Sequence, residues 1–194
     1  FRSIDAGIMP ADFAPHIDGI SGYSGGGNKL VDQYEAIDGG YARDNALRLY
    51  ALHAPHKHIP EIVKHAGLSA NPIYTVATID TYQGMKVQSA FDPAKLGTTL
   101  EEIHALLTRF YNVENSHVRV VPIDEVRASN DINFKRFSAF TSKTGEVDDG
   151  LDIFVTGWSD MKGSQVTITA ILDNLGKGAA AQAIQNLKLM LDLE

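Results

Sequence analysis

Alternation of apolar residues near the C-terminal end is the sequence feature that most constrains the fold. In the segment 165–172, apolar side chains stand at every second position, namely Val166, Ile168, Ala170 and Leu172. A period of two is typical of a β-strand with one covered face. Similar short runs predict strands at 73–79, 85–91, 118–121 and 151–155, and a short apolar segment at 17–20 runs into a glycine-rich loop. The chain is therefore expected to build a sheet.

Three segments predict helices that cover this sheet. The clearest is 98–111, where Thr98 or Thr99, each with a glutamate three residues later, forms a capping box. Its apolar face comprises Leu100, Ile103, Leu106, Leu107 and Phe110. Pro60 fits the first turn of a second helix that ends before Gly67, and a third helix is opened by the glycines of 176–178. Strands interrupted by helices predict an α+β fold with a mixed, mostly antiparallel sheet covered by helices.

Composition excludes several classes of protein. The 194 residues suit one domain, and the formal net charge of −7 argues against non-specific binding to nucleic acid or to an anionic membrane. No apolar run approaches the roughly 18 residues of a membrane-spanning helix, and the start FRSIDAGIMP shows no signal peptide. The chain contains no cysteine, which removes disulfides, thiolate zinc sites and cysteine nucleophiles together.

A cluster of histidines lies in the segment 53–61, which contains His53, His56, His58 and Glu61. Histidine exchanges protons near neutral pH, so a general acid/base loop is one interpretation. A zinc site is a second, although the spacing is not H-E-x-x-H and Pro55 and Pro60 deny one continuous helix. A solvated polar loop is the third.

The loop SGYSGGGNK at 21–29 resembles a phosphate-binding P-loop without matching it. Gly22 and Gly27 have the required separation, but Lys29 comes one residue late and Leu30 stands where a hydroxyl is needed. What remains is a backbone nest with two hydroxyls and a lysine, suited to an anion or an acyl oxygen, or a glycine-rich turn without a ligand. Asn28 is predicted to cap a short helix after it. The small-residue helix start GKGAAA at 176–181 is either a second anion site or a place of close packing.

Taken together, these segments resemble the N-acetyl-γ-glutamyl-phosphate reductase family in its shorter form. The resemblance rests on AGIMPADF, ISGYSGGGNKLV, HKHIPEI, the turn QGM, FYNVENSHVRV and ILDNLGKGAAAQAIQNLKLML, and spans essentially the whole chain. It implies reduction of N-acetyl-γ-glutamyl phosphate with NADPH to the semialdehyde and phosphate, in arginine biosynthesis. It also implies a fold like the second domain of glyceraldehyde-phosphate and aspartate-semialdehyde dehydrogenases.

The resemblance further implies a longer parent protein. Members of the family carry an N-terminal dinucleotide-binding domain and a catalytic cysteine in a G-C-Y-P motif, and neither is present here. We therefore expect residues 1–173 to form the substrate-binding, catalytic and subunit-contact domain. Residues 174–194 are expected to form a C-terminal helix that packs on the absent NADP-binding domain. A cytoplasmic homo-oligomer that binds a small acyl phosphate, with no nucleic-acid or membrane partner, is the corresponding expectation.

The resemblance assigns roles to individual residues. His56, in the HKHIPE motif, is the expected catalytic acid/base. Residues expected to contact the substrate are Ser21, Gly22, Ser24, Gly25, Lys29, Tyr50, His58 and Glu61. Gly178 and Asn186 are expected to approach the NADP cofactor, and no metal ligand is assigned. Three alternatives stay open: the analogous aminoadipyl-phosphate reductase of lysine biosynthesis, a zinc-dependent hydrolase or metal-binding module, and a pure interaction domain.

Overall fold

The computed structural model describes residues 7–36, 46–113, 117–129, 131–132, 149–161 and 163–193. Its strands are β1 (His16–Gly22), β2 (Leu47–Tyr50), β3 (Ile73–Ile79), β4 (Met85–Phe91), β5 (Val118–Val120), β6 (Leu151–Asp160) and β7 (Gly163–Leu172). Its α-helices are α2 (Asn28–Tyr34), α4 (Ile59–Ala66), α5 (Leu100–Tyr111), α6 (Ile123–Arg127) and α8 (Ala181–Met190). Shorter helical turns are η1 (Tyr23–Gly26), η2 (Pro93–Leu96) and the π-helical η3 (Gly176–Ala180).

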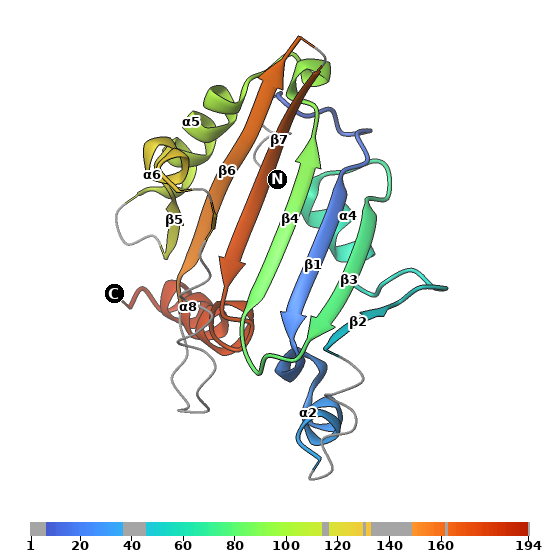
Figure 1. The fold of residues 1–194 in the computed structure, drawn as a ribbon. Coiled ribbons are helices and arrows are strands. Elements are labelled where there is room, and N and C mark those ends of the chain that lie inside the picture. The colour runs from blue at the N-terminus through green and yellow to red at the C-terminus, as the bar shows by residue number, and fades with distance from the viewer. Residues whose placement is uncertain are drawn as a thin grey trace.

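The strands form one seven-stranded sheet in the order β2-β3-β1-β4-β7-β6-β5 (Figure 1). Two neighbouring pairs, β1–β3 and β5–β6, are parallel, and the other four are antiparallel. The predicted α+β class with a mixed, mostly antiparallel sheet is therefore confirmed. The long β6–β7 hairpin, ten residues in each strand, extends β6 well past the predicted end at Val155 because every added residue finds a partner in β7.

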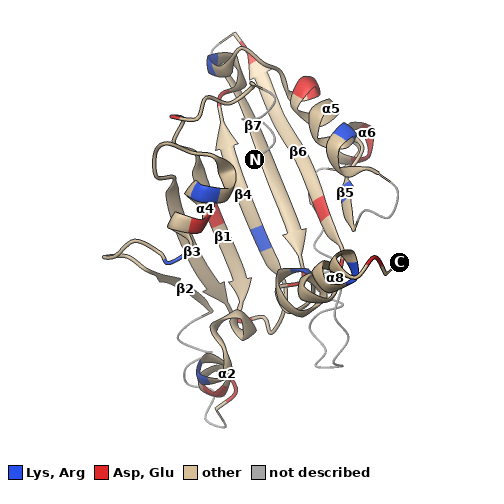
Figure 2. Cartoon of the chain, turned by 180° about the vertical axis from the view of Figure 1, so that it is seen from behind, with Lys and Arg blue, Asp and Glu red and all other residues tan. Residues whose placement is uncertain are grey.

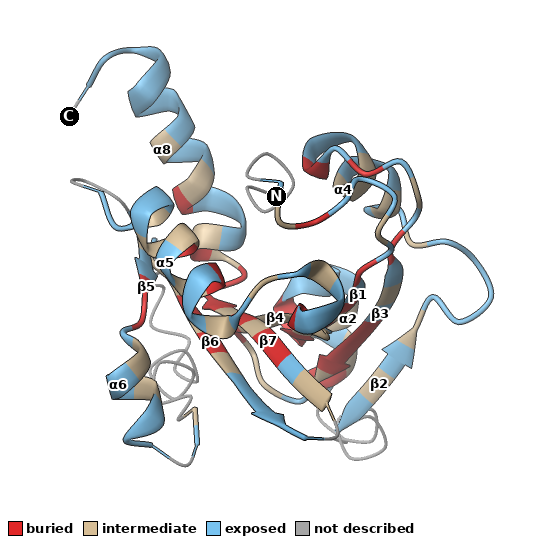
Figure 3. Cartoon of the chain, turned by 90° about the horizontal axis from the view of Figure 1, so that it is seen from above, coloured by how far each residue is buried: buried red, intermediate tan, exposed pale blue. Residues whose placement is uncertain are grey.

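Helices α4 and α5 lie on the same side of the sheet (Figures 2 and 3). Under α5, Ile103 and Leu107 pack against a fully buried cluster from the strands, made of Val120, Ile153, Val155 and Val166. The β7 residues Val166 and Ile168 belong to this covered face, as the alternation predicts. Burying side chains of this size is the main favourable contribution to folding.

Local signals set the helix ends. Thr99 caps α5, its hydroxyl accepting from the Glu102 N–H, while the Glu102 carboxylate accepts from the Thr99 N–H. The capping box is therefore made by Thr99 rather than Thr98. Helix α4 has Pro60 in its first turn and ends at Gly67 in the left-handed conformation, as predicted. Asn28 is not a cap, because α2 begins at Asn28 itself after Gly27 and has no side-chain cap.

The C-terminal segment projects from the sheet (Figure 3). It starts as the π-helical turn η3 rather than as one regular helix, and α8 follows. Ala181 is buried at the start of α8, whereas the apolar side chains further along are exposed, among them Ile184, Leu187, Leu189, Met190 and Leu191. Within the described residues, most of the apolar surface of α8 therefore lacks a cover.

Candidate functional site

The glycine-rich loop at the end of β1 is fixed by backbone hydrogen bonds to the turn 81–84. The N–H groups of Gly22, Tyr23 and Ser24 donate to the carbonyls of Gly84, Thr81 and Tyr82 over 2.8, 2.9 and 3.1 Å. A Cβ on Gly22 would lie 2.7 Å from two backbone oxygens of this turn, so a side chain there is excluded. Residues 22–24 are thus held closely against this turn, whereas residues 25–29 of the loop are exposed.

A buried polar network ties this loop to the C-terminal segment. Asn174 donates from Nδ2 to the Ser24 Oγ over 2.9 Å and accepts at Oδ1 from the Gly84 N–H over 2.7 Å. Asp173 is 0% exposed. Its Oδ2 accepts from Gln83 Nε2 over 2.7 Å, and its Oδ1 accepts from the Leu175 N–H. Residue-type reasoning missed Asp173 and Asn174, and the only sequence signal was their place in the stretch ILDN.

Ser21 and Gly25 lie in the same tight region. Ser21 is buried, and its hydroxyl donates to the Gly22 carbonyl over 3.0 Å. A Cβ on Gly25 would lie 2.7 Å from the Ser21 Oγ and 3.3 Å from the Asn174 Nδ2. The four predicted residues Ser21, Gly22, Ser24 and Gly25, hereafter the loop group, therefore lie close together, and only Gly25 among them is exposed.

A second group surrounds His56 and comprises Tyr50, His56, His58 and Tyr74, hereafter the histidine cluster. The His56 ring centroid lies 4.7 Å from that of His58, 5.2 Å from that of Tyr74 and 5.7 Å from that of Tyr50. The His58 N–H donates to Nδ1 of His56 over 3.3 Å. Tyr50 comes from β2 and Tyr74 from β3, so the sheet edge holds the imidazole on the loop before α4.

The environment of His56 favours its neutral form. Partial burial, together with the positive charge that a protonated His58 and Lys57 carry, lowers the pKa of His56 below its usual 6.5. The two tyrosines stay neutral as well, because burial raises the pKa of Tyr50 and of Tyr74 above the ordinary 10. At neutral pH His56 is therefore an unprotonated base with its ring in an aromatic setting.

The predicted site residues outside these two groups are dispersed. Lys29 is exposed on α2, and Glu61 is exposed in the first turn of α4. Asn186 is exposed on α8, where its Oδ1 accepts from Gln182. Within the described part of the chain, no hydrogen bond or ring contact joins the loop group to the histidine cluster.

Gly178 lies in the π-helical turn η3, directly after the buried network. Its N–H donates to the Asp173 carbonyl over 2.8 Å, and a Cβ there would come 3.3 Å from that oxygen. The neighbouring Lys177 donates to Gln185, and burial lowers its pKa in spite of the charge of Asp149. The turn thus exposes small residues next to a firmly held backbone.

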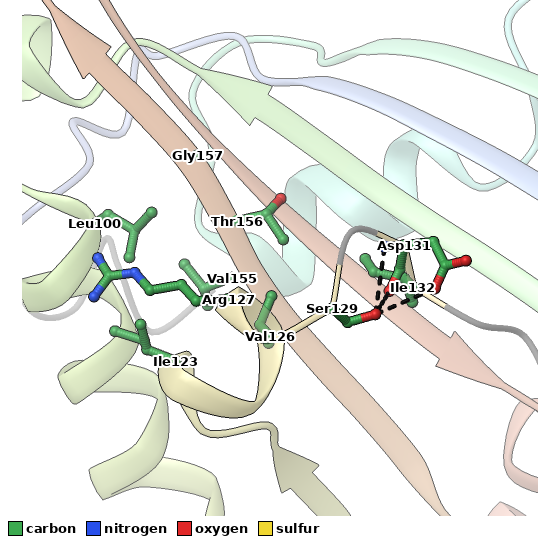
Figure 4. Close-up of a pocket in the computed structure, with 10 residues that line it drawn as sticks. All are labelled: Leu100, Ile123, Val126, Arg127, Ser129, Asp131, Ile132, Val155, Thr156 and Gly157. Carbon is green, nitrogen blue, oxygen red and sulfur yellow. Dashed lines mark hydrogen bonds between the residues drawn. The ribbon is translucent and has the colours of Figure 1, made fainter.

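A pocket in the described residues lies elsewhere. It has a volume of about 360 Å³ and lies between α5, α6 and β6 (Figure 4). Its basic member Arg127 pairs with Glu101 over 2.8 Å, and no predicted site residue lines it. Among the described residues, no three histidine or acidic side chains converge as a metal site requires, and no helix there is long and apolar enough to cross a membrane. Two stretches that carry the resemblance extend outside the described residues, at Ala6 and at 114–116.

Comparison with known proteins identifies relatives over nearly the whole chain. An N-acetyl-gamma-glutamyl-phosphate reductase of Burkholderia cenocepacia is 38% identical over 190 residues, which are 97% of this chain and 57% of the relative. One of Rhizobium etli is 38% identical over 188 residues, which are 96% of this chain and 57% of the relative. N-acetyl-gamma-glutamyl-phosphate reductase 2 of Pseudomonas putida is 35% identical over 190 residues, which are 97% of this chain and 56% of the relative. The chain thus spans somewhat more than half the length of these relatives.

The fold is also found among solved structures. Aspartate semialdehyde dehydrogenase II from Vibrio cholerae superposes with a TM-score of 0.54 at 12% identity, over 91% of this chain and 55% of that one. The family model of the semialdehyde dehydrogenase dimerisation domain matches residues 3–174, which include all seven strands of the sheet but not η3 and α8. This chain belongs to the semialdehyde dehydrogenase dimerisation-domain family.

Proposed function

We propose that this chain is the acid/base and dimerisation part of an N-acetyl-γ-glutamyl-phosphate reductase. The parent enzyme reduces N-acetyl-γ-glutamyl phosphate with NADPH to the semialdehyde and phosphate, a step of arginine biosynthesis. The observation that carries the proposal is the alignment of 96–97% of the chain with relatives of that name at 35–38% identity. The aromatic contacts around a neutral His56 support it, because the reaction needs a group that first accepts and then returns a proton.

The nucleophile comes from outside these residues. Reduction of an acyl phosphate through a covalent intermediate begins when a thiolate attacks the carbonyl carbon and phosphate leaves with the bonding electron pair. The chain has no cysteine, so we assign this thiolate to the remaining part of the parent. NADPH, when bound, supplies the hydride that reduces the resulting thioester.

His56 is proposed to manage the proton in both halves of the reaction. Its lowered pKa makes the imidazole a base that accepts the thiol proton, and the charged form then donates to the aldehyde oxygen as the product forms. Tyr50 and Tyr74 hold the ring through their aromatic contacts with it. Glu61 and Lys29, both exposed, are proposed to meet the substrate from the surface.

The loop group and η3 are proposed to line the floor of the complete site. The loop group offers glycines and backbone close to the buried network, which suits an acyl chain or the nicotinamide end of the cofactor. At η3, Gly178 has no side chain and is exposed, so a cofactor held by another domain fits against it. Asn186 is proposed to approach the same cofactor from α8. Residues 174–194 are correspondingly proposed to pack on an NADP-binding domain, which fits the exposed apolar side chains of α8.

Homo-oligomerisation is proposed to use the sheet face opposite α4 and α5. On this face Leu49 of β2 and Ile73 of β3 are about 60% exposed, and they lie on the same side by strand register. On the same face Lys86 pairs with Asp18 across β4 and β1. Exposed apolar side chains beside a paired charge suit a second copy of the same surface. In sedimentation, the unchanged chain is expected to be a dimer and Leu49→Asp a monomer. The matched control Leu189→Asp, on α8, is expected to remain a dimer.

An assay of the full-length parent tests the activity. The purified, tag-free enzyme is given semialdehyde, phosphate and NADP, once with the N-acetylglutamyl compound and once with the aminoadipyl compound. We expect NADPH formation with the first and a kcat/KM at least tenfold lower with the second. The reverse preference would move the protein to lysine biosynthesis. Absence of turnover together with one equivalent of bound zinc would replace the reductase with a metal-dependent function.

A further inference from the structure

Asn174 connects three strands where they meet at one end of the sheet. At this end β1 and β7 finish and β4 begins (Figure 1). The side-chain amide of Asn174, directly after β7, bonds both the Gly84 N–H before β4 and the Ser24 hydroxyl after β1. Asn174 is 6% exposed and Ser24 is 8% exposed, so both contacts are shielded from water. The proposed proton transfers at His56 make no use of this amide.

The backbone fixes the direction of these hydrogen bonds. A backbone N–H can only donate, so the oxygen of the Asn174 amide must face Gly84 and its NH₂ group must face Ser24. The Ser24 Oγ therefore accepts, over 2.9 Å, and its own proton is left for another partner. Among the described residues, no oxygen accepts that proton. The Ser24 hydroxyl is thus prepared to donate to an oxygen from outside this domain.

Asp173 holds the segment that carries this amide. Its two carboxylate oxygens accept from Gln83 Nε2 and from the Leu175 N–H, over 2.7 and 2.8 Å, and its carbonyl accepts from the Gly178 N–H over 2.8 Å. The residue before Asn174 is therefore fixed by three hydrogen bonds. A polar group held in this way by a supporting shell of further contacts keeps its orientation when a ligand binds.

The ligand side of this contact is open at Gly25. Gly25 follows Ser24 and is exposed, and an added Cβ would lie 2.7 Å from the Ser21 Oγ and 3.3 Å from the Asn174 Nδ2. A side chain at this position would cover these polar atoms, whereas the glycine leaves room for an oxygen of a bound molecule. The carboxylate of Asp173, one residue from Asn174, repels an anion, which favours an uncharged oxygen.

We propose that Asn174 is a positioning residue, which makes the Ser24 hydroxyl a donor to a carbonyl-type oxygen of a bound molecule. The inference rests on the proposed function, in which the loop group meets the substrate and the nicotinamide end of the cofactor. Both molecules carry such an oxygen: NADP has one in its carboxamide, and the substrate has them in its N-acetyl and acyl groups. Asn174 acts through Ser24 and touches neither molecule itself.

The test compares Asn174→Asp and Ser24→Ala in the full-length parent, assayed in the oxidative direction. Aspartate keeps the shape of asparagine and still accepts from the Gly84 N–H, but its second oxygen also accepts and turns the Ser24 proton toward itself. In either variant we expect the KM for NADP or for the semialdehyde to rise about 3- to 10-fold, the loss of one hydrogen bond. A raised KM for NADP assigns the carboxamide oxygen, and a raised KM for the semialdehyde assigns a substrate oxygen.

The double variant separates positioning from simple damage. In the Asn174→Asp background, Ser24→Ala should raise that KM by less than about twofold more, because the hydroxyl no longer reaches the bound molecule. Asn112→Asp is the matched control, since Asn112 also uses its amide as donor and acceptor, toward the backbone of Val120 beside α5. Its KM values should match those of the unchanged enzyme, even where its stability falls.

Urea unfolding shows which variants are folded. If Asn174→Asp does not fold, Asn174→Ala replaces it, because the Ser24 hydroxyl then has no amide to orient it. Ser24→Ala should cost less in that background than in the unchanged enzyme. An equal effect of Ser24→Ala in both backgrounds, or unchanged KM values in Ser24→Ala, would overturn the inference.

Binding measurements separate this inference from the proposed activity. In titration calorimetry with NADP and with N-acetylglutamate, we expect the unchanged parent to bind at least one probe. Asn174→Asp and Ser24→Ala should bind that probe about 3- to 10-fold more weakly, and Asn112→Asp should bind it normally. Equal binding by all variants, or no binding of either probe to the unchanged parent, would overturn the inference, and normal turnover would then leave the reductase intact. Weaker binding in both variants without any turnover of the unchanged parent would instead refute the proposed reductase and keep the role of Asn174.

Discussion

Replacement of Gly22 by alanine should destabilise the domain through a steric clash that can be read directly from the structure. An added Cβ meets the Thr81 and Tyr82 carbonyl oxygens at 2.7 Å and the Gln83 nitrogen at 2.9 Å. All three are backbone atoms, and the turn is held by the very hydrogen bonds that Gly22 and Ser24 make. Overpacking of this kind costs about 1–3 kcal/mol. Alanine also lowers the conformational entropy of the unfolded chain, which stabilises the folded state by about 0.4–1 kcal/mol, because the backbone of Gly22, at φ −56°, is compatible with alanine.

The net loss is therefore expected at about 1–2 kcal/mol in the free energy of unfolding, measured by urea titration followed by circular dichroism. Gly163→Ala is the matched control, because no atom lies within 4 Å of its added Cβ. That variant should be neutral within about 0.5 kcal/mol, or slightly more stable. Equal unfolding midpoints for the two variants would refute the view that the loop is locked onto the turn.

Three further outcomes are expected. The isolated 194 residues should not reduce the acyl phosphate at any pH, because they contain no cysteine, and NADP reduction in the presence of semialdehyde and phosphate would contradict this. Amide hydrogen exchange should be fast in α8 and slow in β7 at low protein concentration, and equal protection of both would show that α8 packs on this domain. Burial and Glu35 raise the pKa of Tyr23 to about 12, so the unfolded chain loses its tyrosine proton first and stability should fall as pH rises from 10 to 12. Tyr23→Phe should weaken that fall, and an unchanged slope would show that Tyr23 is not its source.

Local signals predicted the individual elements well. The capping box before α5, the proline and glycine that bound α4, and the alternation in β7 all act within one element, so the sequence alone reveals them. The four-residue strand β2 and the five-residue helix α6 were not predicted, because short elements depend on their neighbours for stability. The parallel pairing of β1 with β3 around the intervening α4 joins residues more than fifty positions apart, and no local pattern encodes it.

The candidate site was predictable only in part, for a similar reason. His56 and the loop group stand out by residue type and spacing, and the resemblance gave them roles. Asp173 and Asn174 acquire their significance from contacts between segments that are distant in the sequence. The buried network exists only because β7 ends beside the turn 81–84.

The most direct test of the account is the turnover of the full-length parent with His56→Asn, compared with His53→Asn and His65→Asn. The structure places His56 between Tyr50 and Tyr74, whereas the two control histidines are exposed. We predict that His56→Asn lowers kcat by about 10²–10⁴-fold while the KM for substrate stays within a few-fold, and that the controls stay near the unchanged rate. Equal losses at His53 and His56, or full turnover in His56→Asn, would contradict the proposed acid/base role of this domain.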